Sequence, residues 1–165
     1  MSQKKETVIT KDAANKKLLI VREFEAPVDQ VWDAWTQSEL LDQWWPPKPY
    51  KAVTKSMDFR EGGFWLYYMK GPEGDIHWCR ADYSRIVAQK EFEYKDAFCD
   101  EKGTPIDPMP NMHWVCNFAL SSAGTKVSIE LTFQSDADIE RIIEMGFKEG
   151  FAAAHNNLDE LLAAQ

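Results

Sequence analysis

The chain has 165 residues, a formal net charge of −8 at pH 7 and seven tryptophans. Its length predicts one domain with one core, and a hydrophobic fraction of 44% supplies the material for that core. The negative charge disfavours nucleic acid or an anionic membrane surface as the main partner.

Cysteine usage and the N-terminal sequence indicate the compartment. Cys79, Cys99 and Cys116 are an odd number of cysteines with no CxxC pair, which is typical of free thiols in a reducing cytosol. The first residues contain no apolar signal-peptide region, and no apolar run reaches the roughly 18 residues of a membrane span. We therefore expect a cytoplasmic protein without a membrane span. Residues 1–15 are predicted to be a flexible polar segment, and residues 16–165 a single domain.

A strand and two short helices are predicted at the start of the domain. Residues 17–25 are rich in apolar and β-branched side chains, which favours a strand. Pro27 suits the first turn of a helix, and apolar residues follow it at helical spacing. Residues 36–39 (TQSE) have the form of a capping box, which predicts a second short helix that ends at the prolines of residues 46–49.

The middle of the chain has the composition of consecutive strands. Residues 100–111 contain three prolines and a glycine, which predicts an exposed loop or lid. The predicted strands cover residues 50–60, 64–70, 76–87, 91–99, 112–120 and 127–133. The order of one strand, two helices, about six strands and a long helix predicts an α+β fold with an antiparallel sheet.

One long C-terminal helix is predicted over residues 135–165. Ser135 is a suitable N-cap, and apolar residues then recur with the period of one buried helical face. Gly146 and Gly150 lie on that face, although glycine inside a helix costs about 1 kcal/mol relative to alanine. We infer that a strand or a bound molecule approaches the helix backbone at these glycines.

Five short motifs occur along this order of elements. They are RxFxAP at residues 22–27, VWxAxT at 31–36, LL with WWxP at 40–47, DxRxGG at 58–63, and GxxxGF at 146–151 followed by Leu158 and LL at 161–162. Together they resemble the START-like, or SRPBCC, helix-grip superfamily, and within it the branch named after the activator of heat-shock protein 90 ATPase. The resemblance covers roughly residues 18–162.

The resemblance implies a helix-grip fold, in which a curved antiparallel β-sheet of about six to seven strands wraps around the long C-terminal α-helix. Two short helices follow the first strand. Members of the superfamily are known for an elongated, largely apolar cavity between sheet and helix. The chain departs from the family pattern at residues 83–89, where Arg85 replaces an acidic residue and prolines are missing, and at His155, which takes a leucine position.

The residues predicted to line such a cavity are mainly aromatic, with two polar groups that would orient a ligand. Trp44 could instead close one end of the core, as could Trp45, and His155 could be a satisfied core histidine. Arg80 would be a surface charge, together with Asp82, if their strand face points outward. The predicted ligand-binding residues are Trp44, Tyr67, Trp78, Arg80, Trp114, Phe118, Phe147, Phe151 and His155.

Three functions follow from these observations. The first is binding of a small, mostly apolar molecule that resembles a lipid, a polyketide or an aromatic compound. The second is a co-chaperone-like role in a stress response through contact with a chaperone ATPase, which a filled core would favour. The third is a cyclase, dehydratase or hydrolase acting on a polyketide-like substrate, which a strongly shifted pKa at His155 or Asp82 inside an open cavity would favour.

No catalytic residue, cofactor or metal site is predicted. His77 and Cys79 share a strand face, but a zinc site needs three or four ligands and no recognised spacing supplies them. Both faces of the strand at residues 64–69 are aromatic or apolar, so one face is expected to line the core or cavity and the other to meet a partner subunit or the N-terminal segment. A homodimer is therefore one interpretation of this strand.

Overall fold

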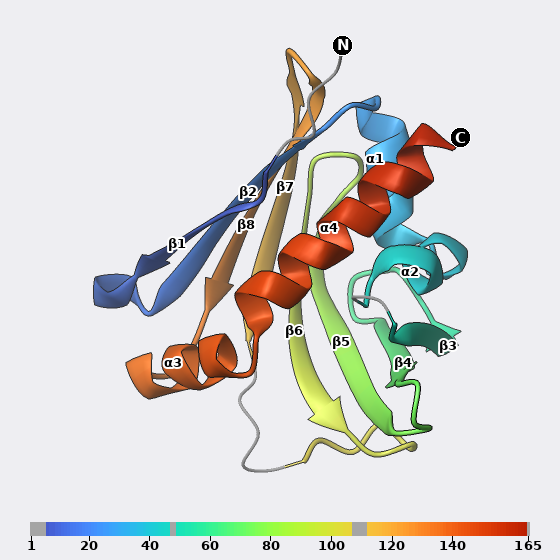
Figure 1. Cartoon of the computed structure of the whole chain (residues 1–165), viewed down its shortest axis with the longest axis vertical. Helices are drawn as coiled ribbons and strands as arrows, with labels where there is room; N and C mark the ends of the chain where they lie inside the picture. The colour runs from blue at the N-terminus through green and yellow to red at the C-terminus, as the bar shows by residue number, and fades with distance from the viewer. Residues whose placement is uncertain (1–5, 47–48, 107–111, 165) are drawn as a thin grey trace.

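A single antiparallel sheet organises the structure, which is a computed structural model and describes residues 6–46, 49–106 and 112–164 (Figure 1). The strands lie side by side in the order β1-β2-β8-β7-β6-β5-β4-β3. Their bounds are β1 (Val8–Asp12), β2 (Lys17–Phe24), β3 (Lys51–Met57), β4 (Phe64–Lys70), β5 (Ile76–Val87), β6 (Glu91–Cys99), β7 (His113–Ser121) and β8 (Gly124–Thr132). The predicted α+β helix-grip fold is confirmed, with eight strands instead of six to seven.

The additional strand is β1, in the polar N-terminal region where no strand was predicted. It pairs with β2 from Val8 opposite Val21 to Asp12 opposite Lys17, and the 3-10 helix η1 (Ala13–Asn15) joins the two strands. In β2 every second residue is buried, as expected for a strand with one face on the core. Strand β1 has no such alternation and buries none of its residues fully.

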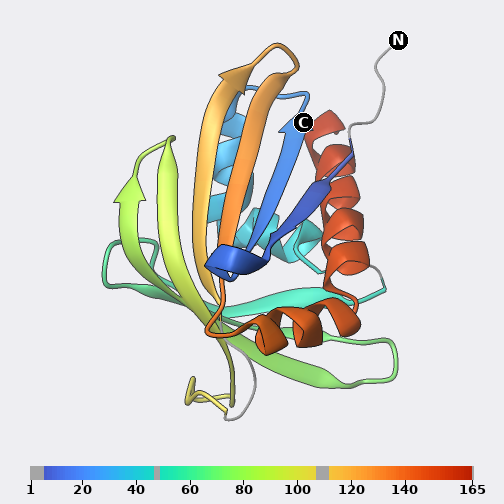
Figure 2. The same cartoon turned by 90° about the vertical axis from the view of Figure 1, so that its left-hand side faces the viewer.

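The helices occupy the concave side of the sheet. They are α1 (Val28–Thr36), α2 (Ser38–Trp44), α3 (Asp136–Glu144) and α4 (Phe147–Ala163). Helix α4 crosses the sheet (Figure 1). Helices α1 and α2 lie beside the C-terminal half of α4, and α3 lies at the N-terminal end of α4. Figure 2 shows the sheet curving around α4. None of the helices in the described ranges is long and apolar enough to cross a membrane.

The predicted single C-terminal helix is two helices, which corrects the expectation from the sequence. Ser135 caps α3 as predicted, because its hydroxyl oxygen accepts a hydrogen bond from the Asp138 N–H at 3.1 Å. Gly146 has a φ of 90°, a left-handed conformation that ends α3 and redirects the chain into α4. Gly146 is therefore the break between two helices, and the hydrophobic period continued across it because both helices cover the same core.

The predicted capping box at residues 36–39 is not formed. The Thr36 hydroxyl donates to the carbonyl of Trp32 at 2.8 Å, inside α1, and therefore caps no helix. Gln37 precedes α2 without a side-chain cap. The two short helices were nevertheless predicted correctly, and residues 47–48 of the predicted proline stop lie outside the described residues.

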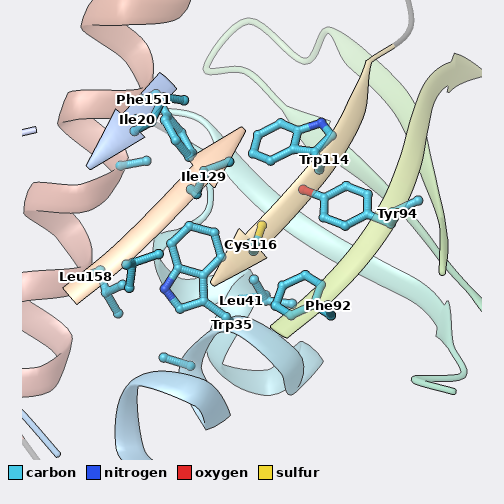
Figure 3. Packing of buried hydrophobic residues seen from close by; sticks show 14 of the residues in the cluster. Ile20, Trp35, Leu41, Phe92, Tyr94, Trp114, Cys116, Ile129, Phe151 and Leu158 are labelled. Carbon is cyan, nitrogen blue, oxygen red and sulfur yellow. The ribbon is translucent and has the colours of Figure 1, made fainter. Parts of the chain in front are cut away.

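Aromatic side chains fill the core between the sheet and the helices. Trp35 of α1 packs against Trp44, Phe118 and Phe151, with ring centroids 4.8, 6.0 and 6.4 Å away. Figure 3 shows Trp35 between α4, which carries Phe151 and Leu158, and the strands of the sheet. The core is thus built by residues from both ends of the chain.

The convex side of the sheet is partly covered by the segment after β6. Arg80 donates from Nη1 to the Gly103 carbonyl at 2.8 Å, and Lys55 donates to the Glu101 carbonyl at 3.0 Å. Leu66 lies beneath Gly103 and is buried on this side. Of the predicted loop over residues 100–111, residues 107–111 lie outside the described part of the chain.

Candidate functional site

The pairing of β4, β5 and β6 decides which side chains face α4. Residues directly opposite each other in an antiparallel ladder point to the same side of the sheet. Tyr67 is opposite Cys79, and Cys79 is opposite Phe98, so these three share the concave side. Tyr68 and Trp78 are paired one residue along and share the convex side.

A cavity of about 280 Å³ lies between this part of the sheet and the junction of α3 and α4. Its walls are mostly apolar and aromatic, and they come from four strands, both C-terminal helices and the end of α2. Gly146 and Gly150 line the cavity, but no described atom lies within 4 Å of a Cβ placed on Gly146, so its positive φ and not a close approach accounts for that glycine. The lining residues are Trp45, Tyr67, Met69, Cys79, Asp96, Ala97, Phe98, Met112, Trp114, Ile142, Met145, Gly146, Phe147, Gly150 and Phe151.

Asp96 of β6 is the carboxylate in this lining. Its Oδ1 accepts from the Met112 N–H and its Oδ2 from the Trp114 indole N–H, both at 2.9 Å. Burial raises its pKa to about 7, because removing the carboxylate from water costs more than these two donors return. The cavity therefore contains an acid that changes its charge near neutral pH.

The other titratable groups around the cavity keep their neutral forms. Burial raises the pKa of the Cys79 thiol to about 12 and holds the pKa of the Tyr67 hydroxyl well above its ordinary value. The Tyr67 hydroxyl oxygen accepts from the Trp45 indole N–H at 3.0 Å. Asp96 is thus the group whose ionisation changes the electrostatics of the site near pH 7.

Four of the predicted ligand-binding residues line the cavity together, namely Tyr67, Trp114, Phe147 and Phe151. Phe147 and Phe151 stack at 5.2 Å, and Trp114 meets Phe151 edge to face at 5.7 Å. Their role in binding stays a prediction; three of them contact one another directly, and Trp45 connects Tyr67 to the other three.

Three further predicted residues lie in the core outside this lining. Trp44 is fully buried, and its indole N–H donates to the Ala34 carbonyl at 2.8 Å. Phe118 packs on Trp32 at 5.1 Å. The His155 ring lies 6.3 Å from that of Trp44 and 5.6 Å from that of Phe24 in β2, measured between ring centroids. The neighbouring Trp45, not Trp44, reaches the cavity, because successive residues at the end of a helix point in different directions.

Trp78 and Arg80 are on the convex side, which corrects the predicted face of β5. Arg80 donates to both carboxylate oxygens of Asp82 and lies 4.7 Å from the centre of the Phe64 ring. Trp78 packs on Tyr68 with ring centroids 4.8 Å apart. The alternating pattern of β5 was compatible with either face, and the register against Tyr67 decides between them.

His155 belongs to a buried polar cluster next to Arg22. The Thr7 hydroxyl oxygen accepts from Arg22 Nη1 at 2.9 Å and lies 2.8 Å from His155 Nδ1. The direction of the hydrogen bond between Thr7 and Nδ1 is set by the tautomer of His155. His155 Nε2 has no hydrogen-bond partner within the described ranges. This histidine is a core residue, as the alternative interpretation held, although only one of its nitrogens is satisfied.

The titration of His155 by itself is expected to lower the free energy of unfolding by about 2 kcal/mol between pH 7.5 and pH 5, while Asp96, whose pKa is raised, contributes with the opposite sign. Burial lowers its pKa from 6.5 to about 3, so below pH 6.5 the unfolded chain binds a proton that the folded chain does not. The His155 contribution to the free energy of unfolding then falls by about 1.4 kcal/mol per pH unit until the folded pKa is reached, and it is measured as the difference between the intact protein and a variant without this histidine. Urea unfolding at both pH values checks this, with His155→Leu as the variant that cannot titrate. An equal pH dependence in both proteins would contradict the assignment.

Asp96, Trp45 and Phe98 were not predicted as site residues. A signal for Asp96 is present in the sequence, because in β6 the apolar residues Phe92, Tyr94 and Phe98 occupy one phase of the alternation and Asp96 shares it. Because the other face of β6 also carries charged residues, Asp96 did not stand out as a charge on the apolar face. For the described ranges, no cluster of three or more potential metal-ligating side chains is found.

The chain has relatives among known families and structures. The family model described as Activator of Hsp90 ATPase homolog 1-like protein matches residues 25–163. A solution structure of a protein from Arthrobacter aurescens is 31% identical, with a TM-score of 0.89, over 96% of this chain and 92% of the other. A crystal structure of a protein from Mycobacterium smegmatis is 29% identical, with a TM-score of 0.88, over 97% and 98%. Among curated proteins, none matched.

Proposed function

We propose that this protein, which belongs to the Activator of Hsp90 ATPase homolog 1-like family, binds a small, mostly apolar molecule. The molecule would occupy the cavity between the sheet and the C-terminal helices. The family membership agrees with the resemblance inferred from the sequence motifs. The observation that carries the proposal is the cavity itself, with its aromatic walls and its few polar groups.

The size of the cavity limits the ligand. Pockets for drug-sized ligands measure roughly 300–1,000 Å³, and this one, at about 280 Å³, lies just below that range. It would suit a molecule of one or two rings better than a sterol or a long-chain lipid. Binding would be driven by burial of apolar ligand surface against Trp45, Trp114, Phe147 and Phe151.

Replacing Phe147 by alanine should weaken binding of such a molecule at least about fivefold, because an aromatic contact contributes roughly 1 kcal/mol beyond its buried area. Phe147 is half-buried and stacks on Phe151, so its loss opens the cavity without removing the centre of the core. The measurement is a titration with small neutral aromatic probes such as 2-naphthylmethanol. It would be followed by tryptophan fluorescence and by the rise in melting temperature that ligand binding produces.

The matched control is Phe59→Ala. Phe59 is also half-buried and aromatic, but it packs on Trp32, Tyr83 and Phe92 and lies outside the cavity lining. This variant should lose stability while keeping the affinity of the intact protein. Equal weakening in both variants, or no saturable binding of any probe, would contradict the proposal.

Two other interpretations have less support. A co-chaperone-like contact with a chaperone ATPase rests on the family description. A filled core would favour that function, whereas this protein has a cavity. The enzyme interpretation named His155 and Asp82, and neither lines the cavity. Asp96 does, and we assign it to binding below. The homodimer and the cytoplasmic location stay predictions.

A further inference from the structure

We propose that the cavity selects small aromatic amines, with Asp96 receiving the protonated amino group and the surrounding rings enclosing it. The proposal rests on the proposed function, that the cavity binds an apolar molecule at all, and adds the chemical class of that molecule.

The first argument is the unbalanced charge of Asp96. Its carboxylate accepts two hydrogen bonds from protein N–H groups, and a carboxylate offers about four acceptor positions. Neither donor is a cation, and within residues 6–46, 49–106 and 112–164 no basic side chain forms an ion pair with it. A ligand with a positive charge and N–H donors would neutralise the carboxylate and fill its remaining acceptor positions.

The second argument is the arrangement of aromatic rings around the carboxyl group. Trp114 donates its indole N–H to Asp96, so its ring lies directly beside the carboxylate. Trp45 and Phe151 lie 5.8 and 5.7 Å from the Trp114 ring, and Tyr67 is joined to Trp45 by a hydrogen bond. Aromatic faces attract ammonium groups, and they do so more strongly when water is excluded.

The third argument is that no neighbouring charge competes for the ligand. Tyr67 of β4, Cys79 of β5 and Tyr94 of β6 are the titratable groups that interact electrostatically with Asp96, and burial raises the pKa of each above its ordinary value. They are neutral at pH 7. Helix α4 faces the cavity with Phe147 and Phe151, which do not ionise.

The pH dependence of binding follows with a definite sign. The pKa of Asp96 is raised to about 7 by burial, so half of the sites carry the charge at that pH. A protonated amine binds the charged carboxylate, and its affinity should therefore rise as pH increases from 6 to 8. A neutral ligand of the same shape should show no such rise.

The test compares three probes with one ring system, 2-naphthylmethylamine, 2-naphthylmethanol and 2-naphthoate, by fluorescence titration of the intact protein. At pH 8 the amine should bind about 10- to 100-fold more tightly than the alcohol, because both can donate a hydrogen bond to the carboxylate but only the ammonium group also neutralises its charge. The carboxylate should bind most weakly. In Asp96→Asn the preference for the amine should disappear while the alcohol still binds. Glu93→Gln removes a charge from the opposite face of β6, and it should change neither the preference for the amine nor the affinity for the alcohol.

Each outcome has a distinct meaning. Equal affinity for amine and alcohol would overturn the selectivity for amines and leave the proposed function standing. No binding of any of the three probes would contradict the proposed function itself. If Asp96→Asn does not fold, the intact protein still decides, because a preference for the amine that fails to grow between pH 6 and pH 8 would overturn the role of Asp96.

Discussion

Replacing Asp159 by asparagine is expected to lower the free energy of unfolding by about 3 kcal/mol, because it leaves the Arg22 guanidinium buried without its anion. The Arg22 side chain is 1% exposed, and it forms an ion pair with Asp159 across the interface between β2 and α4. Its remaining partners are neutral oxygens, Thr7 Oγ1 at 2.9 Å and Asn156 Oδ1 at 3.2 Å. Urea unfolding at pH 7 measures the effect. We expect the lower end of the range for buried pairs, since Asp159 is itself 23% exposed.

Asp58→Asn is the matched control for this ion pair. Asp58 also pairs with an arginine, Arg60, but that arginine is 67% exposed and water replaces the lost partner. Its effect should be much smaller. The double variant Arg22→Met with Asp159→Asn should recover part of the lost stability, because no buried cation remains. Equal losses for Asp159→Asn and Asp58→Asn would show that the buried pair has no special role.

Gly124→Ala is the second large effect we expect, a loss of about 2–5 kcal/mol. Gly124 begins β8 with a φ of 140°, a conformation that is strained for any residue with a Cβ, at a cost of roughly 1–3 kcal/mol. A Cβ there would also lie 2.7 Å from the Ala26 carbonyl oxygen and 2.8 Å from that of Phe24. Both are backbone atoms, so relief requires the end of β2 to move, which adds a cost of overpacking.

Gly74→Ala separates the steric conflict from the backbone strain. Gly74 also has a positive φ, of 86°, but no described atom lies within 4 Å of a Cβ placed on it. It should therefore lose only the cost of its conformation, about 1–2 kcal/mol. Thermal unfolding of both variants gives the comparison. If Gly124→Ala is no less stable than Gly74→Ala, the close approach of Ala26 and Phe24 does not constrain the fold.

Most elements were predictable because their local signals agree with the tertiary environment. Strands β4, β5 and β6 have the predicted bounds, since each has high β-propensity and ends at turn residues. The two short helices and the Ser135 cap also follow from local chemistry. Strand β1 was missed, because its three β-branched residues, Val8, Ile9 and Thr10, stand in an otherwise polar segment and the strand is completed by pairing with β2.

The candidate site was predicted less completely, and β5 shows the reason. Its residues Cys79, Ala81 and Tyr83 are buried, while Trp78 and Arg80 are not on the cavity side. Both phases contain residues that could line a pocket. Shifting the strand by one residue moves every side chain that faces the cavity to the other side of the sheet. Hydrophobicity does not indicate which face is buried when both faces carry apolar or aromatic side chains.

What the sequence determined by itself is most of the elements, their order and the aromatic content of the core, because propensity, capping and periodicity act within a few residues. The tertiary structure alone decided that α3 and α4 separate at Gly146, that β5 turns Cys79 inward and that Asp96 lies among aromatic rings. These features depend on strand register and on contacts between residues far apart in the chain, such as Arg22 with Asp159 and Asp96 with Trp114. Such contacts fix which face of each element is buried, and therefore which side chains a ligand would meet.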